Sequence, residues 1–291
     1  MAVWSRLRTR AVERSGGGRR WRWAAVVSAV VIVLGVGGYV AFQRARPYLH
    51  GSACEVRTAA GKMQLSLEQG ANSSTIAAVA FRKQLPERAA VIAYATAIQE
   101  SDLRNLAGGD RDSVGMFQQR PSQGWGTPAQ LRDPVQSTSK FFDALVKVKD
   151  YLDRDLHDAA QRVQRSADGD AYAQHEANGR LLARAFTGRE TGAARCWYPP
   201  NKRTAARRAE AVREMRRAFG GRLQVADAGG HSAVRVSNAR SGWAVAAWAM
   251  THAQVYGLTE VRHAGLHWEA DAGHDGWTKD PGAPSGQVVL R

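Results

Sequence analysis

Three features are scarce in this sequence of 291 residues: long uncharged segments, cysteines and internal repeats. Only residues 23–43 form a long uncharged segment, and a single span cannot line a pore, so we exclude a channel or a transporter. We find no convincing internal repeat, and two cysteines allow one intramolecular disulfide at most. Apolar residues, at 44%, suffice for the core of one large domain or two modest ones.

Residues 23–43 (WAAVVSAVVIVLGVGGYVAFQ) are long enough to cross a bilayer as a helix, since a rise of about 1.5 Å per residue covers the roughly 30 Å of hydrocarbon. Acids are nearly absent before this segment, where seven arginines face one glutamate, and only two arginines follow it closely. The positive-inside rule therefore predicts a single-pass protein of the cell membrane, with a cytoplasmic basic tail (1–22) and an extracellular remainder after residue 46.

A cleaved signal peptide is the alternative for this segment. Its apolar region would be about 7–15 residues long and would end at a small-residue cleavage site. The uncharged run is longer than that, and YVAFQRARP offers no such site, so we expect an uncleaved anchor.

The formal net charge is +15, but nine arginines and one glutamate lie in the first 46 residues, so the extracellular part has an excess of about seven positive charges. This excess favours an acidic partner such as cell wall or the anionic membrane surface, although a bias toward arginine accounts for much of it. We do not expect nucleic acid as a partner, because the part of the chain after the membrane anchor is predicted to be extracellular.

The two cysteines, Cys54 and Cys196, both lie in the part predicted to be extracellular, where thiols are oxidised. They predict one disulfide, with two unrelated buried thiols as the alternative. The bridge would close a loop of 142 positions and clamp the two ends of one folded unit. The chain then divides into the tail (1–22), the transmembrane helix (23–43), a cysteine-bracketed domain (51–198) and a C-terminal remainder (205–291).

The bracketed domain is predicted to be mostly α-helical. Asn72 to Ser74 are good helix caps, so we expect a helix to begin there and to stop before Leu85-Pro86. The next helix, PERAAVIAYATAIQES, has a proline and an acid in its first turn and is then almost entirely apolar, which is typical of a buried helix. Further helices are expected at 137–151, 157–166 and 170–187.

Glu100 lies in the last turn of this apolar helix, and a glycine-containing loop follows. The helix macrodipole disfavours a negative charge at this end, and partial burial disfavours it further. A carboxylic acid that stays protonated near neutral pH can protonate a leaving oxygen, so Glu100 is a candidate general acid. A glutamate that merely reaches solvent is the alternative. In the loop, Gly108, Gly109 and Gly115 would let the backbone approach a ligand, and Gln118 could donate and accept hydrogen bonds.

The pair Glu100-Ser101 followed by SVGMFQ (113–118) resembles the lysozyme-like lytic transglycosylases of bacterial cell walls. The phrases QQRPSQGWGT, DPV and AAQRVQRSADGDAYAQHE extend the resemblance to a secreted or anchored actinobacterial branch of that superfamily, over about residues 54–196. The resemblance implies a lysozyme-like helical domain that cleaves the MurNAc-GlcNAc bond of peptidoglycan glycan strands, with no cofactor. In the family the glutamate protonates the glycosidic oxygen.

Carried over by position, the resemblance makes Glu100 the catalytic acid and later the base. It assigns the other matched positions to support of the acid and to the sugar-binding cleft: Ser101, Ser113, Gly115, Met116, Phe117, Gln118 and Tyr172. The family's Ala-Tyr-Asn signature appears here only as Ala171-Tyr172-Ala173, without the asparagine. We expect the hydroxyl of Tyr172 to hydrogen-bond near Glu100.

The number of catalytic carboxylates decides the reaction type. Glycoside hydrolases commonly use two, whereas the family's transglycosylases use one glutamate, because a hydroxyl of the sugar itself attacks and closes an anhydro ring. GGDRDS is also typical of a turn with local hydrogen bonds. We expect transglycosylase chemistry, with a water-using lysozyme reaction as the close alternative. The candidates for a second carboxylate are Asp102, Asp110, Asp112 and Asp133.

The C-terminal remainder is expected to be a small α+β domain of unknown role. SGWAVAAWAMTHAQVYG predicts a helix, LTEVRHAGLHWEA a hairpin and GQVVLR a final strand. Before them, NKRTAARRAEAVREMRRAFGG predicts an amphipathic helix whose arginines either face solvent or contact lipid or wall polymer. Its apolar stripe would consist of Ala205, Ala209, Val212, Met215 and Phe219.

The aromatic and histidine residues of this remainder have structural explanations. The aromatic side chains could stack on sugars, but a small domain needs the same residues for its core, and we expect the core. His263 and His267 are four positions apart without the acidic helix motif of a zinc site, so no metal is expected. The aromatic residues in question are Trp243, Trp248, Tyr256, Trp268 and Trp277.

Two functions of different classes fit the sequence. The first is a membrane-anchored enzyme that cleaves peptidoglycan, which the joint presence of Glu100, Gly115 and Gln118 favours. The second is a non-catalytic wall-binding or scaffold protein with the same fold, which the missing asparagine favours.

Overall fold

The computed structural model describes residues 17–165, 170–221 and 223–291, so residues 1–16 of the predicted tail lie outside it. The chain forms two compact units, residues 1–46 and 47–291. Helix α1 (Gly17–Leu49) contains the segment Trp21–Arg46, which is long and apolar enough to cross a membrane, with a mean hydropathy of 2.4. Its apolar side chains are exposed, as a lipid-facing surface requires. The predicted segment 23–43 lies within this helix.

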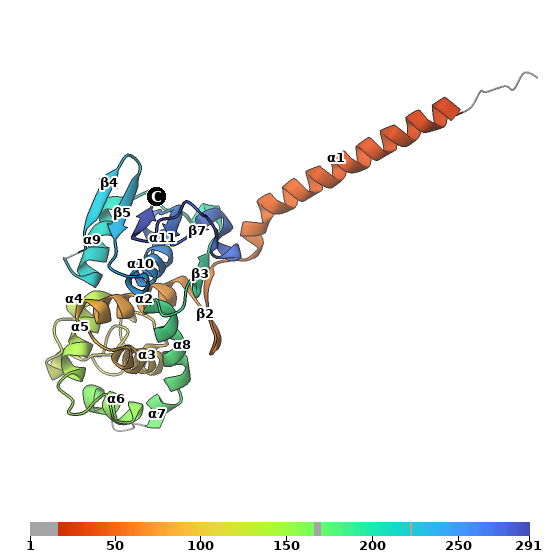
Figure 1. Cartoon of the computed structure of the whole chain (residues 1–291). Coiled ribbons are helices and arrows are strands. Elements are labelled where there is room, and N and C mark those ends of the chain that lie inside the picture. Colours follow the sequence, from red (N-terminus) through yellow and green to blue (C-terminus); the bar gives the residue numbers. More distant parts are fainter. Residues whose placement is uncertain (1–16, 166–169, 222) are drawn as a thin grey trace, which may run out of the picture. The chain divides into compact units, whose positions relative to one another are not determined.

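The second unit combines helices with two small antiparallel sheets (Figure 1). Its longer helices are α2 (Leu67–Arg82), α3 (Glu87–Ser101), α5 (Pro134–Leu145), α6 (Leu156–Gln164), α8 (Glu176–Phe186), α9 (Arg208–Phe219) and α10 (Ala239–Thr251). Its short helical segments are η1 (Pro121–Gln123), α4 (Pro128–Leu131), α7 (Asp170–Ala173), η2 (Pro200–Lys202), α11 (Ala253–Tyr256) and η3 (Ala270–Asp275).

The strands form a three-stranded sheet in the order β2-β1-β3 and a six-stranded sheet in the order β4-β5-β9-β6-β7-β8. The predicted hairpin and final strand are present as β6-β7 and β9, so the mostly helical chain with a C-terminal β part is confirmed in outline. The three-stranded sheet and the β4-β5 hairpin were not predicted. The bounds are β1 (Ala53–Thr58), β2 (Gly61–Leu65), β3 (Ala194–Trp197), β4 (Val225–Ala228), β5 (His231–Arg235), β6 (Glu260–His263), β7 (Leu266–Glu269), β8 (Thr278–Lys279) and β9 (Gln287–Leu290).

Helix α2 begins earlier than the sequence predicted. Ser66 is its N-cap, and a capping box joins Ser66 to Gln69. The polar residues expected as caps lie inside the helix, where distant partners satisfy them: Asn72 donates to the carbonyl of Leu103 at 2.7 Å, and the hydroxyl of Ser74 lies 2.8 Å from that of Thr251. The prediction was wrong because these cap-type residues are satisfied in mid-helix: both bond to neighbouring elements, and Ser74 Oγ also donates to the carbonyl of Ala71 in its own helix at 3.0 Å.

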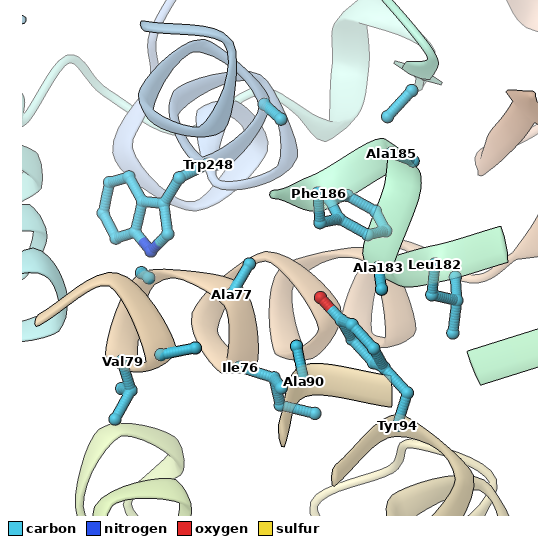
Figure 2. Close-up of a cluster of buried hydrophobic side chains, with 14 of the residues drawn as sticks. Ile76, Ala77, Val79, Ala90, Tyr94, Leu182, Ala183, Ala185, Phe186 and Trp248 are labelled. Atoms are coloured by element: carbon cyan, nitrogen blue, oxygen red, sulfur yellow. The ribbon is translucent and has the colours of Figure 1, made fainter. Parts of the chain in front are cut away.

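A single hydrophobic core runs through residues 47–291, so the boundary expected near residues 199–205 does not separate two cores. Helix α2 contacts α3, α5 and α8 of the predicted first domain and α9 and α10 of the predicted second one. Figure 2 shows Trp248 of α10 next to α2, with Phe186 and Leu182 of α8 and Tyr94 of α3 in the same cluster. The proline pair after Trp197 ends a strand, but the chain returns to pack on α2.

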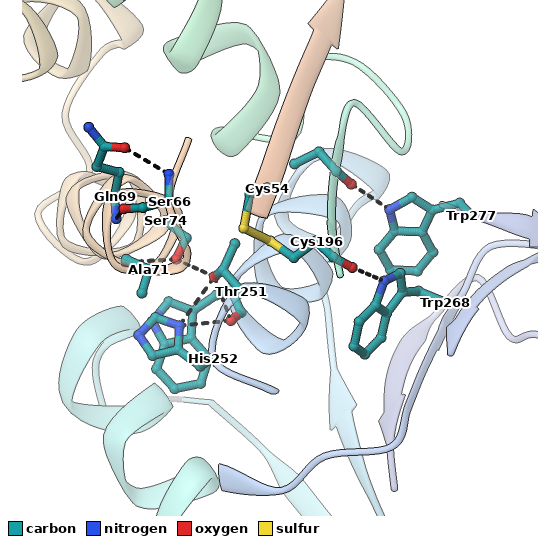
Figure 3. The surroundings of a disulfide bond; sticks show 12 residues. Cys54, Ser66, Gln69, Ala71, Ser74, Cys196, Thr251, His252, Trp268 and Trp277 are labelled. Carbon is teal, nitrogen blue, oxygen red and sulfur yellow. Dashed lines mark hydrogen bonds between the residues drawn. A yellow bond between two sulfur atoms is a disulfide. The ribbon is translucent and has the colours of Figure 1, made fainter. Parts of the chain in front are cut away.

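The predicted disulfide between Cys54 and Cys196 is present (Figure 3). The two residues lie directly opposite each other on β1 and β3, and both are fully buried. The indole of Trp268 on β7 donates to the carbonyl of Cys196 at 3.0 Å, and that of Trp277 donates to the carbonyl of Ala194 at 2.8 Å. The bridge therefore lies where both predicted domains meet.

The C-terminal aromatic residues belong to this core. Trp243, Trp248 and Trp268 are buried, and Tyr256 and Trp277 are partly buried and pack against the core. The stripe of α9 was predicted only in part. Val212 and Met215 are buried, whereas Ala205 and Ala209 are exposed, because the helix begins only at Arg208 and turns its buried face toward Ala211, Val212, Met215 and Ala218.

Candidate active site

Helix α3 carries Glu100 to the surface from the centre of the core. Residues 89–98 of this helix are all buried, and Glu100 is half-buried in its last turn. Asp102 then adopts a left-handed conformation (φ 53°), and Leu103 follows with φ 60°, which ends the helix and turns the chain sharply. The prediction that the apolar helix places an acid at its end is confirmed.

The loop after α3 is held by its own polar side chains. Ser101 Oγ is buried and donates to the carbonyl of Met116 at 2.7 Å, which ties the loop to the helix end. Ser113 Oγ donates to Gln118 Oε1 at 2.9 Å, and Gln118 Nε2 donates to the carbonyl of Gly115 at 2.9 Å. These bonds fix the positions of Ser113 and Gln118, which also line a cleft.

Two of the three glycines of this loop, Gly109 and Gly115, lie close to other atoms of the protein, whereas Gly108 has no neighbour within 4 Å of an added Cβ. At Gly115, where φ is +78°, an added Cβ would lie 2.2 Å from the carbonyl oxygen of Leu131. At Gly109 it would lie 1.7 Å from Gln118 Oε1. Only glycine fits at position 115, whereas a side chain at position 109 would displace the side chain of Gln118. Gly115 packs on the backbone of Leu131 and is not among the residues that line the described part of the cleft beside Glu100.

A cleft of about 410 Å³ opens beside Glu100. Three of the predicted site residues line it, namely Glu100, Ser113 and Gln118. Met116 and Phe117 are fully buried, and the ring of Phe117 stacks on Phe141 with centroids 4.5 Å apart, so these two support the cleft from the core.

Apart from Asp110, a candidate second carboxylate, the sequence did not single out the other residues that line the cleft. Six of them lie within the phrases QQRPSQGWGT and AAQRVQRSADGDAYAQHE, but nothing in their spacing indicated which side chains would face the cleft. The remaining lining residues are Asp110, Gln119, Arg120, Gln123, Trp125, Gln164 and Arg165.

The predicted hydrogen bond between Tyr172 and Glu100 is present. Tyr172 on α7 is buried, and its hydroxyl donates to Glu100 Oε1 at 2.6 Å. Because the phenol is held by the core, this bond fixes the rotamer of Glu100. Ala173, where the resembled family has asparagine, is exposed.

Two amides in the cleft have buried oxygens without a partner. Gln164 Nε2 donates to the carbonyl of Phe117 at 2.7 Å, and Gln119 Nε2 lies 3.3 Å from the carbonyl of Ser137. Their Oε1 atoms have no hydrogen-bond partner among the described residues.

Of the four candidate second carboxylates, only Asp110 lines the described part of the cleft. Asp112 accepts from the backbone and hydroxyl of Ser122 and from Arg120, and these bonds, the Ser122 backbone N–H first, lower the pKa of Asp112 to about 2. These bonds hold Asp112 in a structural role away from the lining of the described part of the cleft.

Asp133 and Asp102 also form hydrogen bonds that stabilise the fold. Asp133 is the N-cap of α5 and pairs with Arg217 of α9. Burial alone would raise the pKa of Asp133, but hydrogen bonds from Gln136 and Arg217 outweigh burial and lower it. Asp102 accepts from Gln69 at 2.9 Å. The arrangement around Glu100 is thus that of one carboxyl group in a polar cleft, with one exposed aspartate on the lining.

No protein-family model matches the chain, and none of the curated proteins compared with it matches. Among the described residues, no group of three or more His, Cys, Asp and Glu side chains is placed to hold a metal ion. His263 is buried, and its Nδ1 lies 3.0 Å from the carbonyl of Gln287, whereas His267 lies beside Thr278.

Proposed function

We propose that this protein is a membrane-anchored, outward-facing glycosidase that cleaves the MurNAc-GlcNAc bond of peptidoglycan, with Glu100 as its general acid and base. The observation that carries the proposal is the bond from buried Tyr172 to Glu100 at the edge of a cleft lined by amides and Trp125. A sugar polymer binds to hydrogen-bonding and aromatic side chains, and its cleavage requires a carboxyl group held in a fixed orientation as the proton donor. The lysozyme-like resemblance of residues 54–196 agrees with this assignment.

The reaction needs one acid only. Because Tyr172 donates to Oε1, the acidic proton of Glu100 resides on Oε2, from which it passes to the glycosidic oxygen as the bond to the anomeric carbon breaks. The carboxylate then accepts the proton of the sugar's own C6 hydroxyl, whose oxygen attacks the same anomeric carbon and closes a 1,6-anhydro ring. The acid is regenerated, and no water is consumed.

A lysozyme reaction is the close alternative within the same proposal. It would use water as the nucleophile and Asp110 as the second carboxylate, because the other three aspartates are held in structural hydrogen bonds. A non-catalytic wall-binding protein is the second candidate, favoured by the exposed Ala173 in place of the family's asparagine.

The masses of the products distinguish these candidates. Purified full-length protein in detergent should release muropeptides from wall sacculi whose sugar ends carry the 1,6-anhydro ring, one water lighter than a hydrolysed end. Mass spectrometry of the released fragments makes the measurement. Reducing ends would assign the protein to the lysozymes, and binding of sacculi without any release would favour the scaffold.

The proposed substrate requires residues 47–291 to lie outside the cell. Protease added to intact spheroplasts should therefore degrade this unit, whereas an epitope placed at the N-terminus should resist until the membrane is permeabilised. Immunoblotting with antibodies to each end makes the measurement. Protection of the large unit in intact spheroplasts would contradict both the orientation and the substrate.

A further inference from the structure

A second hollow continues the candidate cleft beyond Trp125. It has a volume of about 560 Å³ and shares Gln123, Trp125 and Arg165 with the cleft beside Glu100. Trp125 is half-buried, packs against the core and lines both hollows. The two hollows therefore adjoin at Trp125, and we call the second one the distal groove.

The distal groove has an unbalanced positive charge. Two of its charged residues are neutralised, since Asp143 pairs with Lys83 at 2.7 Å and Arg162 pairs with Asp158 at 2.8 Å. The other three, Lys140, Lys147 and Arg165, form no ion pair with any described residue. Apolar side chains, among them those of Ala144, Val148 and Val163, line the same hollow between these cations.

Around this hollow, three cations without an ion-pair partner among the described residues repel one another, and the low-dielectric wall between them strengthens the field inside. An anion bound there would relieve this repulsion. Because the distal groove shares Gln123, Trp125 and Arg165 with the cleft beside Glu100, a polymer bound in that cleft can extend into it. Sugar rings fit the apolar wall and Trp125, and acidic substituents on those rings fit the cations.

We propose that the distal groove binds free carboxylates carried by the substituents of the glycan strand, so that the protein prefers acidic, peptide-bearing strands to neutral strands with the same sugar backbone. The inference rests on the proposed glycan cleft and adds a charge preference to it. Lys140, Lys147 and Arg165 are specificity residues in this proposal and take no part in bond cleavage.

Two glycan probes test the preference by binding alone. Peptide-bearing wall strands are acetylated at their amines, and one half is then amidated at its carboxylates, so that the two probes differ only in negative charge. The full-length Glu100→Gln protein in detergent binds each probe without turnover. We expect about tenfold tighter binding of the carboxylate probe at low salt, since each exposed ion pair contributes a factor of roughly 1.4–5, and a smaller difference at high salt.

The matched variants assign this preference to residues. Lys140→Gln/Lys147→Gln/Arg165→Gln, made in the Glu100→Gln protein, should bind the two probes about equally, and an unchanged circular dichroism spectrum shows that the variant is folded. Lys62→Gln/Lys202→Gln/Lys279→Gln changes the net charge equally at exposed positions outside the groove and should keep the preference.

Equal binding of both probes by the parent would overturn the inference, as would a preference that survives in the first triple variant. Tighter binding of a glycerol-phosphate polymer than of the carboxylate strands would assign the groove to another wall component and overturn it too. A Glu100→Gln protein that still releases muropeptides would refute the proposed acid, while the binding comparison would still decide the carboxylate preference.

Discussion

Replacing Glu100 with glutamine should lower muropeptide release by at least about a hundredfold, because general acid–base catalysis typically contributes about 10²–10⁴-fold. The amide keeps the size of the side chain and can still accept the hydrogen bond from Tyr172, but it cannot supply a proton to the glycosidic oxygen. Release from sacculi by the full-length protein is measured by chromatography, and binding to sacculi should persist because the rest of the cleft is unchanged.

Asp110→Asn is the matched control, since Asp110 is an aspartate on the lining of the same cleft. Transglycosylase chemistry with one carboxyl group predicts that this variant keeps nearly full activity. A loss as large as that of Glu100→Gln would instead make Asp110 the second carboxylate of a lysozyme. If Glu100→Gln released muropeptides at the wild-type rate, Glu100 would not be the acid.

Removing the Cys54–Cys196 bridge should lower the free energy of unfolding of residues 47–291 by about 5 kcal/mol. The estimate is the chain entropy regained when a loop of 142 residues is opened, and residual structure in the unfolded chain would make the loss smaller. For a unit of this size such a loss lowers the melting temperature by roughly 10–20 °C. The Cys54→Ala/Cys196→Ala variant of the full-length protein is compared with wild type by guanidinium unfolding in detergent, followed through tryptophan fluorescence.

Wild-type protein refolded under reducing conditions is the control for this variant, because it lacks the bridge but keeps both side chains in the core. The two bridgeless forms should unfold at similar denaturant concentrations, with the alanine variant slightly lower owing to the lost volume. Equal midpoints for the bridged and bridgeless forms would show that the loop is already constrained without the disulfide.

The sequence by itself determined the features that depend on neighbours along the chain or on a unique partner. The uncharged run in α1 can cross a membrane because length and composition alone decide that property. Helix α3 was expected to be buried because it is apolar on all sides. Glu100 lies in its last turn, so its position where the helix leaves the core could also be expected. The disulfide followed because Cys54 and Cys196 had no other possible partner.

The tertiary structure decided the features that depend on distant residues. Strand β1 pairs with β3 across the whole bracketed segment, and no local pattern in either stretch identifies a partner about 140 positions away. Asn72 and Ser74 looked like helix caps until Leu103 and Thr251 supplied partners from other elements. The two expected domains share one core because α10 packs on α2, a contact between segments more than 150 positions apart in the chain.

The candidate site shows the same division. The motif around Glu100 and Gln118 could be recognised from the sequence because its residues lie close together along the chain. Gly115 was assigned to the ligand, although it is needed for the approach of the Leu131 carbonyl, and Trp125, Gln164 and Arg165 became cleft residues only when the chain folded. The local sequence determined which chemical groups the protein has. Long-range packing decided which of them face the cleft, because the direction of a side chain depends on contacts with residues far away in the sequence.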